Sequence, residues 1–87
     1  MLQETGTKMV YQCRGLPVEL LRKLGFVNHK RGYVKNLENK RRLHATVLKN
    51  RISIHLDEPN PRNPYFHRAR LMVREVREAI NKISQLD

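Results

Sequence analysis

Apolar and polar residues alternate in two stretches, 43–48 and 51–56, that flank Lys49 and Asn50. A period of two on both sides of a short polar break predicts two antiparallel strands joined by a tight turn. Asn50 fits such a turn because asparagine tolerates the left-handed backbone conformation. The apolar positions, which we expect to face the core, are Leu43, Ala45, Val47, Ile52, Ile54 and Leu56.

The length of the turn decides the register of this hairpin. A turn of two or four residues pairs Val47 with Ile52, Ala45 with Ile54 and Leu43 with Leu56 on the apolar face. It pairs Thr46 with Ser53 and His44 with His55 on the opposite face. A three-residue loop would shift the register and separate the two histidines.

A helical pattern precedes the hairpin over about residues 17–24. Val18, Leu21 and Leu24 recur at helical spacing, and Pro17 suits the first turn because its missing N–H costs nothing there. Gly25 supplies a left-handed C-cap, and we expect Phe26 to pack beneath the helix.

A second helical pattern covers 65–86, where apolar residues recur every three or four positions. They are Phe66, Ala69, Val73, Val76, Ile80 and Ile83. The connector 57–64 contains three prolines, which are expected to end the strand. Asn63 and Pro64 then fit an N-cap and a first helical position. On this helix Arg70, Arg74 and Arg77 would form a basic stripe, which we interpret as a solvated face.

Between the first helix and the hairpin, Phe26-Val27 and Tyr33-Val34 have strand composition, Gly32 marks a turn or bulge, and 36–42 reads as a loop. The predicted fold class is therefore α+β: a single two-layer α-β-β-(β)-α sandwich, with an antiparallel sheet that carries both helices on one face. Residues 1–8 are expected to be a flexible end, and 9–87 a single basic domain.

Charge adds the strongest functional signal. The 87 residues carry 18 Lys and Arg against 8 Asp and Glu, a net charge of +10. Residues 22–51 hold ten of the basic residues and one acidic residue, Glu38, so this segment alone has a net charge of +9. Concentrated positive charge in a nearly neutral frame is typical of contact with phosphate backbones.

The predicted hairpin leaves one face of the sheet open to water, and this face gathers the candidate binding residues. It would carry His44, Thr46, Arg51, Ser53 and His55. The flanking basic residues would be Lys30, Arg31, Lys35, Lys40, Arg41 and Arg42. Tyr33 is a candidate for stacking on a base, although a half-buried strand aromatic explains it equally well.

The two histidines suggest a reaction without specifying one. A facing His44 and His55 pair can divide the roles of acid and base over an RNA backbone. Two ordinary surface histidines explain the same pattern, and we favour that interpretation. We expect no metal site, because a third ligand is missing and Asp57 and Glu58 are expected to pair with Arg42 or Arg62.

Other features exclude several classes of protein. A single cysteine, Cys13, permits no internal disulfide and fits the reducing cytoplasm. No apolar stretch is long enough to cross a membrane. Phosphate-binding glycine loops and nucleophile-elbow motifs are absent, so no cofactor is expected.

The stretches 21-LRKLGFVNHKRG-32 and 44-HATVLKNRISIHLDEP-59 resemble HicA-type toxins over roughly half the chain. Arg42-Leu43 stand where that family has Gly-Ser. HicA-type toxins are small ribonucleases of toxin–antitoxin pairs with a double-stranded-RNA-binding-domain-like fold. The resemblance implies that His44 occupies the place of the catalytic histidine and that 51–56 is the second strand.

These observations predict a cytoplasmic nucleic-acid-binding protein, with RNA favoured over DNA. The phosphates would be contacted through the sheet face and the 29–42 segment. The alternatives are a metal-independent ribonuclease that uses His44, and a non-enzymatic adaptor that docks an acidic protein. A homodimer formed through an exposed strand edge is compatible with each of these.

Overall fold

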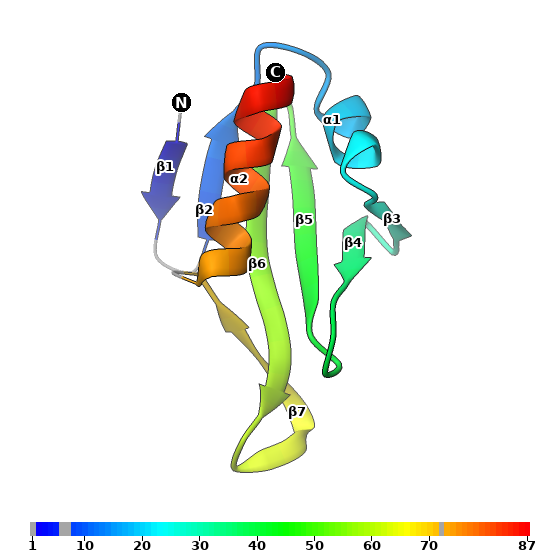
Figure 1. The fold of residues 1–87 in the computed structure, drawn as a ribbon, viewed down its shortest axis with the longest axis vertical. Coiled ribbons are helices and arrows are strands. Elements are labelled where there is room, and N and C mark those ends of the chain that lie inside the picture. Colours follow the sequence, from blue (N-terminus) through cyan, green and yellow to red (C-terminus); the bar gives the residue numbers. More distant parts are fainter. Residues whose placement is uncertain (1, 6–7, 72) are drawn as a thin grey trace.

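The computed structural model describes residues 2–5, 8–71 and 73–87, and these form seven strands and two helices (Figure 1). In chain order they are β1 (Leu2–Thr5), β2 (Lys8–Gln12), α1 (Pro17–Lys23), β3 (Val27–His29), β4 (Gly32–Asn36), β5 (Arg42–Leu48), β6 (Arg51–Asn60), β7 (Asn63–Arg70) and α2 (Arg74–Leu86). The strands make one antiparallel sheet in the order β1-β2-β6-β5-β4-β3, and β7 also pairs with β6. The predicted α+β class with an antiparallel sheet is confirmed.

The β5–β6 hairpin has the predicted register. Val47 lies opposite Ile52, Ala45 opposite Ile54 and His44 opposite His55. The left-handed residue of the turn is Lys49, with φ of 57°, rather than Asn50. The Asn50 carbonyl instead accepts a 2.7 Å hydrogen bond from the Cys13 N–H, which ties the turn to the end of β2.

Helix α1 confirms the prediction for residues 17–24 within one residue. Pro17 is its first residue, and Gly25 follows the C-cap with φ of +91°. The Phe26 N–H donates to the Leu21 carbonyl at 3.0 Å, which turns the chain back and buries the Phe26 ring.

Both helices cover the same face of the sheet, where the core lies. Val76, Ala79, Ile80 and Ile83 of α2 join Leu20 and Leu21 of α1 in one cluster with the apolar residues of β2, β5 and β6. In Figure 1, α2 lies across β2 and β6. The opposite face, called the open face below, carries His44 and Thr46 of β5 with Ser53 and His55 of β6.

The segment between the first helix and the hairpin also agrees with the sequence. Gly32 follows a tight turn that joins β3 to β4, and 37–41 is a loop. The loop closes on itself because the Arg41 N–H donates to the Glu38 carbonyl at 3.2 Å. Asn39 and Lys40 both adopt φ of 61° there.

Two strands precede residue 16, where no element was predicted. β2 pairs with the first half of β6, and β1 pairs with β2. The cue was the alternation of Met9, Tyr11 and Cys13, which are all buried in the core. The expected flexibility of residues 1–8 stays a prediction. Met1, Gly6 and Thr7 lie outside the described residues, and 2–5 form β1.

The prediction of a helix over 65–86 is wrong in its first half. Residues 63–70 form β7, and α2 begins at Arg74. Arg70 is therefore a strand residue, and the expected helical stripe of Arg70, Arg74 and Arg77 does not exist. Met72 lies outside the described residues.

The prolines of the connector did not end the strand as predicted. β6 continues to Asn60, and Pro59 sits beside the register shift in the pairing with β7. Pro64 is the second residue of β7, an edge strand. Proline is tolerated at irregular and edge positions because no ladder N–H is needed there. Asn63 caps no helix; its side-chain oxygen accepts a 3.3 Å hydrogen bond from the Tyr65 N–H.

The β6–β7 hairpin extends past the rest of the sheet. β5 pairs with β6 only as far as Asp57, so residues 58–68 form a two-stranded projection. This projection, together with Ala69 and Arg70 at its base, is called the arm below (Figure 1). Every residue of β7 is exposed. Within the described part of the chain, neither helix is long and apolar enough to cross a membrane.

Candidate functional site

Three histidines from three strands lie together on the open face. The rings of His44 (β5) and His55 (β6) have centroids 5.1 Å apart and are tilted by 41°. The His29 ring (β3) lies 6.2 Å from that of His44, edge to face. The facing of His44 and His55 was predicted, whereas His29 was not singled out.

Gly32 makes room for this grouping. It lies directly opposite His29 on β4. A Cβ added at this position would lie 2.6 Å from the Ala45 carbonyl oxygen and 3.5 Å from the His44 ring. A side chain at position 32 is therefore excluded, and the absence of one leaves room for the His44 ring beside Gly32.

Asp57 completes the cluster at one end. Its carboxylate lies 3.0 Å from Nε2 of His55 and 3.9 Å from Nε of Arg42, which confirms the expected pairing with Arg42. A carboxylate at this distance holds the imidazole of His55 in one orientation, as such groups do in acid–base sites.

The environment of His44 disfavours its charged form. Partial burial lowers its pKa, and the neighbouring charge of His55 lowers it further against the opposing effect of Asp57. Its Nδ1 atom is buried without a hydrogen-bond partner among the described residues. A neutral, partly exposed imidazole is able to accept a proton.

Four cations lie on the strands that carry these histidines or on the loops that join those strands, and we call them the basic rim. Lys30 and Arg31 occupy the β3–β4 turn, Lys40 the β4–β5 loop, and Arg51 the start of β6. The Arg51 guanidinium donates to the Gln12 side chain at 3.2 Å. Within the described residues, none of the four forms an ion pair.

Three predicted site residues lie elsewhere. Lys35 is opposite Leu43, and Tyr33 is opposite Ala45, so both are on the face covered by the helices. Tyr33 is half-buried against the core, the second of the alternatives that the sequence left open. The expectation that Lys35 and Arg41 flank the open face is wrong, because strand alternation turns Lys35 inward and carboxylates on the helix side hold Arg41.

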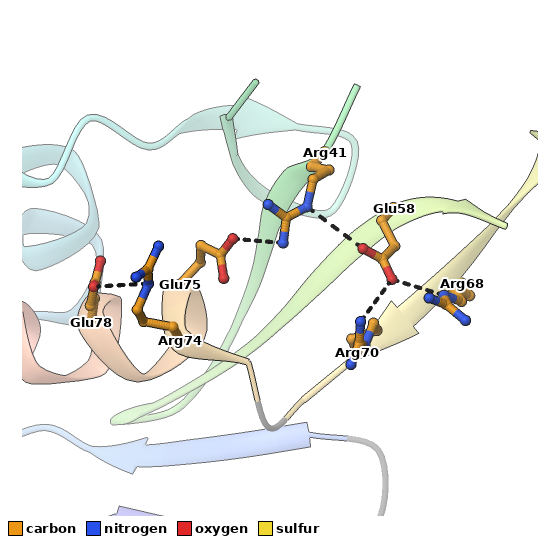
Figure 2. A network of polar contacts seen from close by, with 7 residues as sticks. All are labelled: Arg41, Glu58, Arg68, Arg70, Arg74, Glu75 and Glu78. Carbon is orange, nitrogen blue, oxygen red and sulfur yellow. Dashed lines mark hydrogen bonds and ion pairs between the residues drawn. The ribbon is translucent and has the colours of Figure 1, made fainter. Parts of the chain in front are cut away.

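Figure 2 shows where Arg41 is held. Its guanidinium lies 2.6 Å from Glu75 of α2 and 3.6 Å from Glu58 of β6. Glu58 also accepts hydrogen bonds from Arg68 at 2.8 Å and from Arg70 at 3.3 Å. The predicted alternative, a pair with Arg62, is formed by neither Asp57 nor Glu58. Asp57 contacts Arg42 and His55, and Glu58 contacts Arg68 and Arg70 of β7.

A pocket of about 250 Å³, called the notch below, lies between the β4–β5 loop and the arm. It is lined by Asn36, Leu37, Lys40, Arg41, Arg42 and His67. The Arg42 Nε atom is buried and has no hydrogen-bond partner among the described residues. Sequence reasoning missed His67 because a helix was predicted there.

Within the described part of the chain, no group of three or more His, Cys, Asp or Glu side chains is arranged to hold a metal ion. No protein-family model matches the chain, and no curated protein or solved structure is significantly similar to it. The candidate site therefore rests on its geometry alone.

Proposed function

We propose that this protein binds nucleic acid through the open face, with RNA favoured over DNA. The observation that carries the proposal is the basic rim, whose four cations lie on strands β3 to β6 or on the loops that join them. None of the four forms an ion pair among the described residues. Cations that are not already neutralised are the ones available to replace the counterions of a phosphate backbone.

The preference for RNA rests on the form of the surface. Strands β3 to β6 make a four-stranded antiparallel platform with imidazole rings on it. Sheet platforms with rings that stack on unpaired bases are a common means of RNA recognition, and histidine is among the residues that stack. We place this activity in the cytoplasm, which is supported by the free, buried thiol of Cys13.

The test measures binding of labelled RNA by fluorescence anisotropy between about 50 and 200 mM salt, where phosphate contacts weaken steeply. Replacing Lys30, Arg31 and Arg51 by Gln lowers the net charge from +10 to +7. We expect weaker binding and a shallower dependence of log affinity on log salt. Each phosphate contact contributes about 0.7 to 0.9 to the magnitude of this slope. Losing up to three contacts should therefore reduce the magnitude by up to about 2 to 3.

The matched control replaces Arg22, Arg77 and Lys82 by Gln, which makes the same change in net charge on the two helices. Equal losses in both triple variants would show that net charge, rather than the open face, is responsible. Absence of binding by the unmodified protein at the lowest salt would reject the proposal and favour an adaptor that docks an acidic protein.

A ribonuclease is the second candidate function, and the contact between His55 and Asp57 favours it. His44, with its lowered pKa, would take the proton of a ribose 2′-hydroxyl, and the 2′-oxygen would attack the adjacent phosphorus. The bond to the 5′-oxygen would break, and His55, oriented by Asp57, would give that oxygen a proton. The products are a 2′,3′-cyclic phosphate and a 5′-hydroxyl end, and no metal takes part.

Cleavage of a labelled RNA tests this second candidate. His44→Ala and His55→Ala are each expected to abolish cleavage and to retain most of the binding. Arg77→Gln, on helix α2 and outside both the cluster and the notch, should leave cleavage unchanged. A strand with a deoxyribose at the labelled step must stay intact. Undiminished cleavage in His44→Ala would eliminate this function.

A further inference from the structure

The arm carries two exposed aromatic rings at consecutive positions of β7, so that one projects from each face of the strand. Tyr65 is 93% exposed and Phe66 is 63% exposed, in a strand with no buried residue. Large rings in such positions leave apolar surface in water, and surfaces of this kind commonly mark binding sites. Neither ring belongs to the hydrophobic core cluster of the described residues.

Charge on the arm restricts what can bind there. Residues 60–70 contain Arg62, Arg68 and Arg70 and no acidic residue. Arg68 and Arg70 are directed to Glu58, while Arg62 has no acidic partner among the described residues. A partner that fits must present negative charge together with flat apolar surfaces.

The notch at the base of the arm adds a place for an anion. Lys40 of the β4–β5 loop and His67 of the arm both line it, and neither is ion-paired within the described residues. Arg42 also lines the notch, and its guanidinium neighbours Asp57. The volume of about 250 Å³ far exceeds the ~15 Å³ that one water needs, so a phosphate group fits.

The arm is held in place before any ligand arrives. Glu58 at its base is nearly buried and binds Arg68 and Arg70 of β7, while Arg41 connects Glu58 to Glu75 of α2 (Figure 2). A surface that is already ordered loses less conformational freedom when it binds.

We propose that the arm binds unpaired nucleotides, with Tyr65 and Phe66 stacking on bases and the notch holding a phosphate. This inference rests on the proposed nucleic-acid binding and defines its substrate class, because the faces of bases are accessible only where a strand is unpaired. Stacking of bases on aromatic side chains is largely independent of base sequence, so we expect affinity without strong sequence preference.

A second copy of the chain fits the arm poorly. Among the acidic side chains that the structure describes, six are already ion-paired, so another copy offers little free negative charge to the arm. They are Glu19, Asp57, Glu58, Glu75, Glu78 and Asp87. Nucleic acid supplies both the charge and the flat rings in one ligand.

The experiment compares a labelled oligouridine of about 12 nucleotides, within the range that small single-strand-binding domains cover, with an RNA duplex. Tyr65→Ala and Phe66→Ala together should weaken binding of the single strand by about 5-fold or more. Binding of the duplex should be unchanged. Tyr65→Phe, which keeps the ring, should bind like the unmodified protein.

Leu86→Ala is the control, since Leu86 is 45% exposed at the end of α2, at the opposite end of the molecule from the arm (Figure 1). A second variant, Lys40→Gln with His67→Gln, should remove about one phosphate contact. The slope of log affinity against log salt for the single strand should then become shallower by about 0.7.

Several outcomes would overturn the inference. One is unchanged single-strand affinity in the Tyr65 and Phe66 variant, and another is an equal loss for the duplex. A third is binding of polyglutamate that this same variant abolishes, which would assign the arm to an acidic protein. Failure of the unmodified protein to bind any RNA is a different result, because it removes the proposed function itself.

Discussion

Gly32 illustrates how much one missing side chain decides on the open face. We predict that Gly32→Ala destabilises the fold by about 1–3 kcal/mol, the usual cost of overpacking. The reason is that the added Cβ would lie 2.6 Å from the Ala45 carbonyl, which belongs to a paired strand and has little room to move. Urea denaturation measures the change. Ser53→Ala, on the same face, is the control, and an equal change in both would contradict the prediction.

His44 offers a direct check on the electrostatics of the histidine cluster. Its pKa is lowered chiefly by burial and then by His55, so its NMR titration should have a midpoint below the ordinary value of about 6.5. His55→Asn should raise that midpoint and Asp57→Asn should lower it. Because the neutral form is favoured in the folded state, this contribution to stability is present above the ordinary pKa. It is lost as the pH falls toward the lowered one. A midpoint at or above 6.5 would contradict the assigned environment.

At the scale of elements, the arm depends on one carboxylate. Burial alone would raise the pKa of Glu58, but hydrogen bonds from Arg68 and Arg70 outweigh it and leave the pKa below its usual range. We predict that Glu58→Gln costs about 1–3 kcal/mol, since bonds to a charged group are lost.

Glu58→Gln should also increase the rate at which trypsin cleaves the chain at the arginines of the arm. Glu78→Gln breaks an exposed pair with Arg74 and should cost less than about 0.5 kcal/mol. Identical protease sensitivity of Glu58→Gln and the unmodified protein would show that Glu58 does not hold the arm.

The elements that the sequence predicted are those with a local signal. The β5–β6 hairpin and α1 follow from periodicity and turn residues within a few positions of each other. β7 has no such signal, because none of its residues is buried and its stabilising contacts reach across β6 to Glu58. Phe66 and Ala69 happened to continue the helical spacing of Val76 and Ile80, which extended the predicted helix too far.

The parts of the site that could be predicted are likewise those with a local signal in the sequence. The facing of His44 and His55 followed from the register, and the turn cations Lys30 and Arg31 from their position beside Gly32. His29, the notch and the Glu58 cluster depend on strands that meet only in the folded chain. Lys35 and Arg41 were misplaced because the pattern of charge does not show which face a residue occupies. Alternation along β4 turns Lys35 to the helix side, and an ion pair with Glu75 holds Arg41 there.

At the scale of the whole molecule, three carboxylates predict how the fold responds to acid. The pKa values of Glu58, Glu75 and Asp87 are all lowered; for Asp87 the main causes are hydrogen bonds from the backbone N–H groups of Arg14 and Gly15. A lowered pKa contributes stability that is present above the ordinary value and lost as the pH falls through the folded one. The free energy of unfolding should therefore decline below about pH 4.

Denaturation of the protein between neutral pH and pH 3 measures this decline. Asp87→Asn should make it shallower, because the side chain that accepts those two hydrogen bonds no longer titrates. A decline of equal steepness in the variant would show that Asp87 carries none of the acid sensitivity.

Strand β6 is paired along both edges, with β5 on one side and with β2 and then β7 on the other. Ile52, Ile54 and Leu56 on this strand are fully buried. Their amide hydrogens can meet solvent deuterium only when the sheet itself comes apart, whereas those of β7 need only local opening of the arm. Hydrogen exchange at β6 therefore reports the stability of the entire fold. Exchange at β7 reports how often the arm separates locally from β6.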